Sequence, residues 1–236
     1  MTATTLLRFT TAQALFSWRC VLGSARVGAL VLLGLAVHSA SNLDVLQQSF
    51  QQRWGAAALP KFEAWRKLLV SIGDGSDLDR LKKVNTFFNQ QIQFADDSVV
   101  WNQADYWATP LETLGRGAGD CEDFSIAKYF TLLQLGTQPE KLRLIYVRAK
   151  TGTSDATQAH MVLAYYATPE AEPLVLDNLI NDIRPASRRP DLLPVFSFNS
   201  SGVFTGIAGG GTAAGGTGRL SRWEDLLRRA KTEGFD

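Results

Sequence analysis

The stretch of sequence that decides the fold runs from Gly117 to Leu135 and reads GAGDCEDFSIAKYFTLLQL. Apolar residues after Asp120 recur at helical spacing, which predicts a helix over residues 120–135 with Gly136 as its C-cap. Cys121 opens this helix. The free N–H groups and partial positive charge of a helix N-terminus stabilise a thiolate and could hold a developing oxyanion. The stretch therefore predicts a cysteine nucleophile; the alternative is a small buried residue at a helix start.

Cysteine and histidine are scarce in this chain of 236 residues, which has two of each. Cys20 and His38 lie near the N-terminus, so Cys121 and His160 are the pair that remains in the rest of the chain. His160 opens the strand-like run HMVLAYYA and could act as the base for the thiol of Cys121. The alternative is an ordinary surface or core histidine.

Asp177 lies in the next apolar run, LVLDNLI, where a buried carboxylate is costly unless it is paired. On a strand beside that of His160, it could fix the tautomer of the imidazole, as the acid of a catalytic triad does. Two alternatives remain open. Asp177 could instead form a turn with Asn178, or Asp182 in the polar segment NDIR could supply the acid.

Three carboxylates, those of Asp120, Glu122 and Asp123, flank the predicted nucleophile. Negative charge beside a thiol raises its pKa, so the cluster makes chemical sense if a cation neutralises it. Clustered oxygen ligands suit Ca²⁺. Asp105 and Asn102, from the aromatic loop just upstream, could complete such a site. The alternative is helix capping, because acidic residues are favoured in a first helical turn.

The rest of the chain predicts helices followed by strands. Apolar spacing indicates helices over residues 43–54 and 60–72, and a third that Asp77 caps and that runs to about residue 88. Residues 95–119 form a long loop with aromatic anchors. The predicted strands are residues 141–150, 160–167 and 174–179. Helices first and adjacent strands after them are typical of an α+β domain with an antiparallel sheet.

Composition and charge place the chain among globular proteins, with 45% hydrophobic residues and a net charge of +1. Such a balance lacks the concentrated positive charge of a nucleic-acid-binding protein. Residues 1–40 combine arginines, no acid and an apolar run, which predicts a signal peptide. An uncleaved anchor or a misplaced start codon is the alternative. Residues 41–205 then form the domain, followed by a Gly-rich segment and a C-terminal helix, capped by Ser221, within residues 206–236.

At these residues the sequence resembles the bacterial transglutaminase-like cysteine proteinases of the LapG type. The resemblance covers roughly residues 45–200, and the Cys-His-Asp order within a G-D-C-E-D context is its most specific part. It is carried by the segments Trp107–Leu114 (WATPLETL), Gly117–Phe124 (GAGDCEDF), Lys128–Phe130, Ala159–Val162 and Leu176–Asn178.

The resemblance implies a papain/transglutaminase-like core, in which the nucleophile helix packs on an antiparallel β-sheet and further helices precede it. It implies that Cys121 is the nucleophile, His160 the base and Asp177 the orienting acid. Ca²⁺ would be the cofactor, bound by Asp120 and Glu122, and Asp105 is our addition to that ligand set.

The resemblance also implies a biological role. The family members act in the periplasm and cut the N-terminal region of a large surface adhesin between two alanines, which promotes biofilm dispersal. The implied inhibitor is a LapD-like inner-membrane receptor for cyclic di-GMP. By analogy, the di-alanine at Ala213 and Ala214 in the Gly-rich segment could enter the chain's own active site, although a solvated linker is the simpler interpretation.

Two other functions remain open from the sequence. A transglutaminase or cell-wall amidase could use the same triad, because the fold does not fix which acceptor resolves the thioester. A non-catalytic calcium-binding or receptor-docking module is the second alternative.

Overall fold

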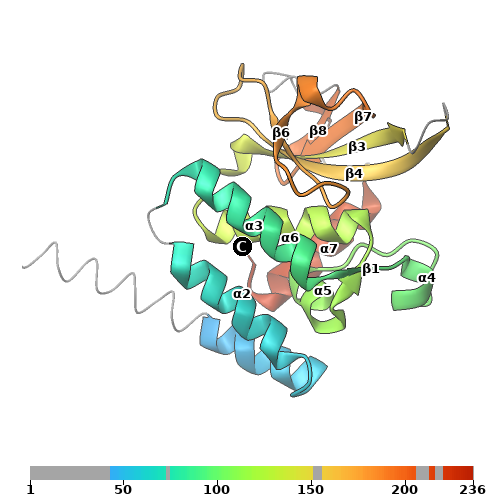
Figure 1. The fold of residues 1–236 in the computed structure, drawn as a ribbon. Coiled ribbons are helices and arrows are strands. Elements are labelled where there is room, and N and C mark those ends of the chain that lie inside the picture. The colour runs from blue at the N-terminus through green and yellow to red at the C-terminus, as the bar shows by residue number, and fades with distance from the viewer. Residues whose placement is uncertain (1–42, 73–74, 151–155, 206–212, 216–219, 236) are drawn as a thin grey trace, which may run out of the picture. The chain divides into compact units, whose positions relative to one another are not determined.

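The computed structural model describes residues 43–72, 75–150, 156–205, 213–215 and 220–235 (Figure 1). All described residues belong to one compact unit of the chain, which begins after residue 41. The predicted signal peptide over residues 1–40 lies outside the described residues. Within the described part, no helix is both long enough and apolar enough to cross a membrane.

Helices make up most of the described residues before residue 135, and the predicted ones are present. They are a helix over residues 43–54, α2 (Leu59–Ile72), α3 (Asp77–Gln91), α4 (Asp97–Val100), α5 (Pro110–Arg116) and α6 (Cys121–Gln134), with α7 (Ser221–Glu233) near the C-terminus. Cys121 is the first residue of α6, as predicted. Gly136 adopts φ 82°, the left-handed conformation that commonly ends a helix.

Two helix starts differ from the sequence prediction. The N-cap of α3 is Ser76, whose side chain accepts a hydrogen bond from the N–H of Asp79, so Asp77 is the first helical residue and not the cap. The N-cap of α7 is Leu220, which has no side-chain capping bond, so the cap predicted at Ser221 is wrong. Both errors are shifts of one residue in a polar stretch where neighbouring side chains could each serve as caps.

The loop predicted over residues 95–119 is wrong in part, because it contains α4, α5 and the strand β2 (Ala118–Gly119). A capping box begins α5. The hydroxyl of Thr109 accepts from the N–H of Glu112, and the carboxylate of Glu112 accepts from the N–H of Thr109. Pro110 occupies the first helical turn. The sequence T-P-L-E at residues 109–112 is a local signal for this helix start.

One antiparallel sheet of seven strands carries the second half of the described chain, in the order β6-β5-β4-β3-β7-β8-β9. Its strands are β3 (Leu142–Lys150), β4 (Thr157–Tyr165), β5 (Leu174–Leu176), β6 (Arg184–Pro185), β7 (Leu192–Asn199), β8 (Gly202–Thr205) and β9 (Ala213–Gly215). The 3-10 turn η1 (Pro139–Lys141) precedes β3, and a second one, η2 (Ala186–Arg188), lies between β6 and β7. The three predicted strands correspond to β3, β4 and a shortened β5.

Strand β7 was not predicted from the sequence, although it pairs with β3 in the centre of the sheet. Its run contains Pro194, and a proline argues against a central strand because it cannot donate a ladder hydrogen bond. The structure tolerates Pro194 because it pairs with Val147 at a register shift between Tyr146 and Val147. Prolines inside sheets occur at such irregularities.

The C-terminal segment belongs to the same folded unit as the sheet. β9 pairs with β8, so Ala213 and Ala214 of the di-alanine lie in an edge strand. α7 buries Trp223, whose indole packs against Tyr129 and Phe198 and donates a hydrogen bond to the carbonyl of Asn199.

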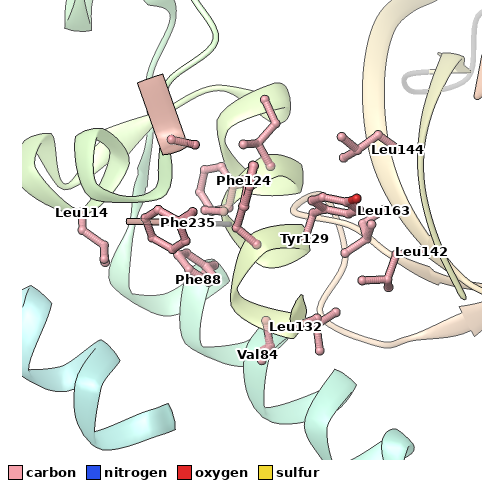
Figure 2. Close-up of a cluster of buried hydrophobic side chains, with 14 of the residues drawn as sticks. Val84, Phe88, Leu114, Phe124, Tyr129, Leu132, Leu142, Leu144, Leu163 and Phe235 are labelled. Carbon is pink, nitrogen blue, oxygen red and sulfur yellow. The ribbon is translucent and has the colours of Figure 1, made fainter. Parts of the chain in front are cut away.

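The core lies between the helices and one face of the sheet (Figure 1). α6 is its centre, contacting α3 and α5 on one side and β3 and β4 on the other, and every residue from Asp123 to Leu132 is buried. A helix that is buried all round in this way needs apolar cover on all sides. Figure 2 shows part of this core: Phe124, Tyr129 and Leu132 of α6 lie among Val84, Phe88, Leu114, Leu142, Leu144, Leu163 and Phe235.

Candidate active site

The N-terminus of α6 fixes the position of Cys121. Asp120 is the N-cap, in extended conformation, and the chain reaches it through β2. A Cβ atom on Gly119 would lie 2.5 Å from Oδ2 of Asp123, so only glycine fits this approach. The Gly-rich sequence that precedes the cysteine therefore has a steric reason.

The thiol of Cys121 is half-buried and faces strand β4. The backbone N–H of Met161 lies within hydrogen-bonding reach of Sγ, and one turn along α6 the hydroxyl of Ser125 donates to the carbonyl of Met161 at 3.0 Å. Met161 directly follows His160, so this pair of contacts brings the helix of the predicted nucleophile against the strand of the predicted base.

His160 and Asp177 form a buried pair. Nε2 of His160 lies 2.8 Å from Oδ1 of Asp177, and both side chains are almost fully excluded from solvent. Because Nε2 is occupied by the carboxylate, Nδ1 is the ring nitrogen left to take a proton from a thiol. Burial alone would raise the pKa of Asp177, but the hydrogen bond and charge of His160 lead the opposing contacts, which lower the pKa to about 2.

The turn that carries Asp177 is held by α3. Nδ2 of Asn89 donates to the carbonyl of Asp177 at 2.8 Å, and Nδ2 of Asn85 donates to the carbonyl of Asn181 at 2.9 Å. Asp177 also accepts the N–H of Leu179 on Oδ1, so it forms a turn and binds the histidine at the same time. The competing Asp182 is exposed and pairs with Arg184.

Acidic side chains gather beside the thiol in two overlapping groups. Asp120, Cys121 and Glu122 form one, and Asp97, Asp120 and Asp123 form the other, each with ligand atoms within 4.8 Å of one another. The second group forms because β1 (Gln93–Phe94) pairs in parallel with β2, which brings the start of α4 to the start of α6.

The three aspartates of the second group are electrostatically strained. Burial, followed by the charges of Glu122, Asp123 and Asp97, raises the pKa of Asp120 to about 9. Burial is also the main cause that raises the pKa of Asp97 and of Asp123. Each aspartate has one buried oxygen that finds no hydrogen-bond partner among the described residues: Oδ1 of Asp97, Oδ1 of Asp120 and Oδ2 of Asp123.

The acidic cluster acts on the nucleophile. The thiol of Cys121 donates a hydrogen bond to Oε2 of Glu122 at 2.8 Å. Burial raises the pKa of Cys121, and the charges of Glu122 and Asp120 raise it further, while the N–H of Met161 opposes them. Carboxylate oxygens without a hydrogen-bond partner are ligands that suit a hard divalent cation. A cation bound here would also offset the negative charge that raises the pKa of the thiol.

Residues 70–190 match the family described as bacterial transglutaminase-like cysteine proteinase. The chain belongs to this family. Solved structures of LapG from Legionella pneumophila are 39% identical to it; one covers 80% of this chain and 97% of LapG, with a TM-score of 0.68. The EGTA-treated form gives the same coverage with a TM-score of 0.69, and the calcium-bound form covers 79% and 98% with a TM-score of 0.68. A comparison with curated proteins finds no match.

As a bacterial transglutaminase-like cysteine proteinase, the chain is a thiol protease of the LapG-like kind, and the predicted α+β architecture is confirmed. LapG from Legionella pneumophila has been solved in a calcium-bound form and after EGTA treatment. Of the ligands predicted here, Asp120 and Glu122 lie together beside Cys121. Asp105 belongs to neither acidic group and pairs with Arg222 of α7 at 3.0 Å, so its role stays a prediction.

Three residues of this proteinase site have no clear signal in the sequence. Asp97 reaches the acidic cluster only through the pairing of β1 with β2. Lys128 is fully buried in α6, and its Nζ has no hydrogen-bond partner in the described part of the chain; burial lowers its pKa to about 7, against the opposing charge of Asp177. Arg189 is buried and donates to Oδ2 of Asp177 at 2.7 Å. For Asp97, the only sign in the sequence is that two aspartates stand together at residues 96–97.

Proposed function

We propose that this proteinase is a calcium-dependent endopeptidase that uses Cys121 as nucleophile, His160 as base and Asp177 as orienting acid. The observation that carries the proposal is the buried hydrogen bond between His160 and Asp177. His160 lies in β4, and the residue that follows it in this strand, Met161, contacts the thiol of Cys121. A nucleophile, a base in reach of it and an acid that holds the base are the three parts that acyl transfer requires.

Each residue of the proposed triad has its own role in peptide cleavage. Nδ1 of His160 takes the proton of Cys121, and the thiolate attacks the scissile carbonyl carbon. The free N–H groups at the start of α6 face the developing oxyanion. The imidazolium, stabilised by Asp177, then donates its proton to the leaving amine. Water activated by His160 hydrolyses the thioester and regenerates the thiol.

Calcium fits the acidic cluster by the chemistry of its donors. Asp97, Asp120 and Asp123 would hold the ion through their unpartnered oxygens, with Glu122 beside them. A bound divalent cation supplies positive charge that offsets the carboxylates around the nucleophile. The calcium-bound and EGTA-treated forms of LapG support this part of the proposal.

The proposed substrate and setting rest on the resemblance to the LapG-type proteinases. We infer that the chain cleaves the N-terminal region of a large surface adhesin in the periplasm and so promotes biofilm dispersal. The arginine-rich, acid-free and then apolar sequence of residues 1–40 supports export. A LapD-like inner-membrane receptor for cyclic di-GMP is the proposed inhibitor.

The test is cleavage of a purified N-terminal adhesin fragment that contains a di-alanine, in Ca²⁺ and in EGTA. We expect cleavage in Ca²⁺ by the wild type and none by Cys121→Ala or His160→Ala. The mass of the product in the presence of an amine donor separates hydrolysis from transamidation. Cleavage by Cys121→Ala, or equal rates in EGTA and Ca²⁺, would contradict the triad and the calcium dependence respectively.

Localisation and inhibition need separate experiments. Cell fractionation should place the processed chain in the periplasmic fraction, with loss of its N-terminal residues by mass. Addition of the receptor's periplasmic domain should stop adhesin cleavage. A cytoplasmic chain that keeps residues 1–40, or cleavage unaffected by an excess of the receptor domain, would overturn those two proposals.

A further inference from the structure

The carboxylate of Asp177 uses both of its oxygens. Oδ1 accepts from Nε2 of His160 at 2.8 Å and from the N–H of Leu179 at 3.0 Å. Oδ2 accepts from Nη2 of Arg189 at 2.7 Å. The orientation of the carboxylate is therefore set from two sides, by the turn on Oδ1 and by a guanidinium on Oδ2.

Arg189 is itself held in place. Its Nε lies 3.0 Å from Oδ1 of Asp191, and its Nη2 lies 2.7 Å from Oδ2 of the same carboxylate. The backbone N–H of Arg189 donates to the carbonyl of Ala186 in η2, and its carbonyl accepts from Leu192 in β7. Only 4% of Arg189 is exposed. A planar guanidinium fixed by a carboxylate on one edge presents its other donors in a rigid fork.

Apart from His160, the cations that act on Asp177 are Lys128 and Arg189, and of these two Arg189 makes a hydrogen bond to it. Lys128 contributes charge from α6, but its Nζ has no hydrogen-bond partner in the described part of the chain. Burial lowers the pKa of Lys128 to about 7, whereas a guanidinium stays charged. The permanent and directional partner of the buried carboxylate is Arg189.

We propose that Arg189 is a positioning residue of the catalytic site, which holds Oδ2 of Asp177 so that Oδ1 stays aimed at Nε2 of His160. This keeps Nδ1 of the imidazole free to accept the proton of Cys121. The inference rests on the proposed triad and adds a fourth side chain, with Asp191 as its anchor. Arg189 acts through Asp177.

The test compares Arg189→Met and Arg189→Lys with a matched control, Arg188→Met, which changes the neighbouring exposed arginine. In the adhesin assay with Ca²⁺, Arg189→Met should lower kcat about 10- to 100-fold and change KM by less than about threefold. This range is the one seen when a residue that orients a metal ligand through a hydrogen bond is replaced. Arg189→Lys keeps one charged donor and should recover most of the activity. Arg188→Met should match the wild type.

A spectroscopic readout separates positioning from stability. In a Cys121→Ala background with ¹⁵N-labelled histidine, neutral His160 should carry its proton on Nε2, assigned by comparison with His160→Gln. Adding Arg189→Met should mix the two tautomers. If Arg189→Met does not fold, Asp191→Asn removes the anchor from a half-exposed position and should produce a smaller change of the same kind.

The outcomes separate this inference from the proposed function. An Arg189→Met enzyme with wild-type kcat and an unchanged tautomer would overturn the role of Arg189 while leaving the triad intact. Loss of kcat by Arg189→Lys equal to that of Arg189→Met, with matched losses of melting temperature and no tautomer change, would show a purely structural role. Activity in Cys121→Ala or in Asp177→Asn at the wild-type rate would instead contradict the triad itself.

Discussion

The thiol of Cys121 donates its hydrogen bond to Glu122, with Sγ 2.8 Å from Oε2. In this arrangement the neighbouring carboxylate competes with His160 for the thiol proton. Calcium held by the acidic cluster would engage that carboxylate and oppose its charge. The cation and the nucleophile are thus linked through one side chain.

The first prediction follows from this link. Alkylation of Cys121 by iodoacetamide should be faster in Ca²⁺ than in EGTA, by about tenfold for each unit that the pKa of the thiol falls. Mass spectrometry of the peptide that contains Cys121 measures the rate, and a free thiol such as glutathione controls for the chelator. Equal alkylation rates in the two conditions would show that the cluster does not control the thiol.

The second prediction concerns the identity of the calcium ligands. Asp97→Asn should abolish the calcium-induced rise in melting temperature, because Asp97 lies within the acidic group and has an orphaned oxygen. Asp105→Asn should preserve that rise, since it breaks only the exposed pair with Arg222, worth at most about 1 kcal/mol. Calorimetric titration with Ca²⁺ checks both variants. Loss of binding in Asp105→Asn would restore that residue to the ligand set.

The third prediction concerns repulsion within the cluster. Asp123→Asn should raise the free energy of unfolding in EGTA by about 1–3 kcal/mol, because it removes a buried carboxyl group that must either stay charged beside other carboxylates or take up a proton. The amide oxygen can still accept the N–H of Ala108, which the carboxylate now binds at 2.7 Å. In Ca²⁺ the order of stability should reverse, because the variant lacks a charged ligand.

Asp96→Asn, at the exposed N-cap of α4, is the control for this effect. Urea denaturation of both variants in EGTA and in Ca²⁺ gives the four values needed. A destabilised Asp123→Asn in EGTA would indicate that the carboxylates are not strained by one another.

The fourth prediction concerns the buried Lys128. Its pKa falls from 10.5 to about 7 on burial, so between those values the unfolded chain binds a proton that the folded chain does not. Stability therefore rises with pH across that window, by up to about 1.4 kcal/mol per pH unit. Lys128→Met should be more stable than the wild type at pH 7, and the gap should narrow as the pH rises towards 10.

Denaturation of both proteins from pH 7 to pH 9 measures the gap, and the difference between them removes the titration of the acidic cluster. Lys82→Met, at an exposed position of α3, controls for the loss of a lysine as such. A constant gap across the range would mean that Lys128 stays charged in the folded protein.

Much of the fold could be predicted from the sequence because its elements carry local signals. The period of apolar residues in α2, α3 and α6 and the alternation in β3 indicate those elements without tertiary information. The start of α5 also had a local signal in Thr109 and Glu112. Strand β7 did not, because Pro194 is compatible with a central strand only where the sheet is already irregular.

The sequence by itself predicted which side chains carry the chemistry of the proposed triad. A scarce cysteine at a predicted helix start, one histidine to pair with it and a carboxylate in an apolar run indicate Cys121, His160 and Asp177, because a helix N-terminus stabilises a thiolate and a buried carboxylate needs a partner. Only the tertiary structure decided their supporting partners. Asp97 reaches the acidic cluster through strand pairing, and Arg189 reaches Asp177 through the turn before β7. Strand pairing brings together residues that are far apart in the sequence, and the residues next to them do not indicate that contact. Helix ends and burial patterns can be predicted because they depend on residues that are close together in the sequence.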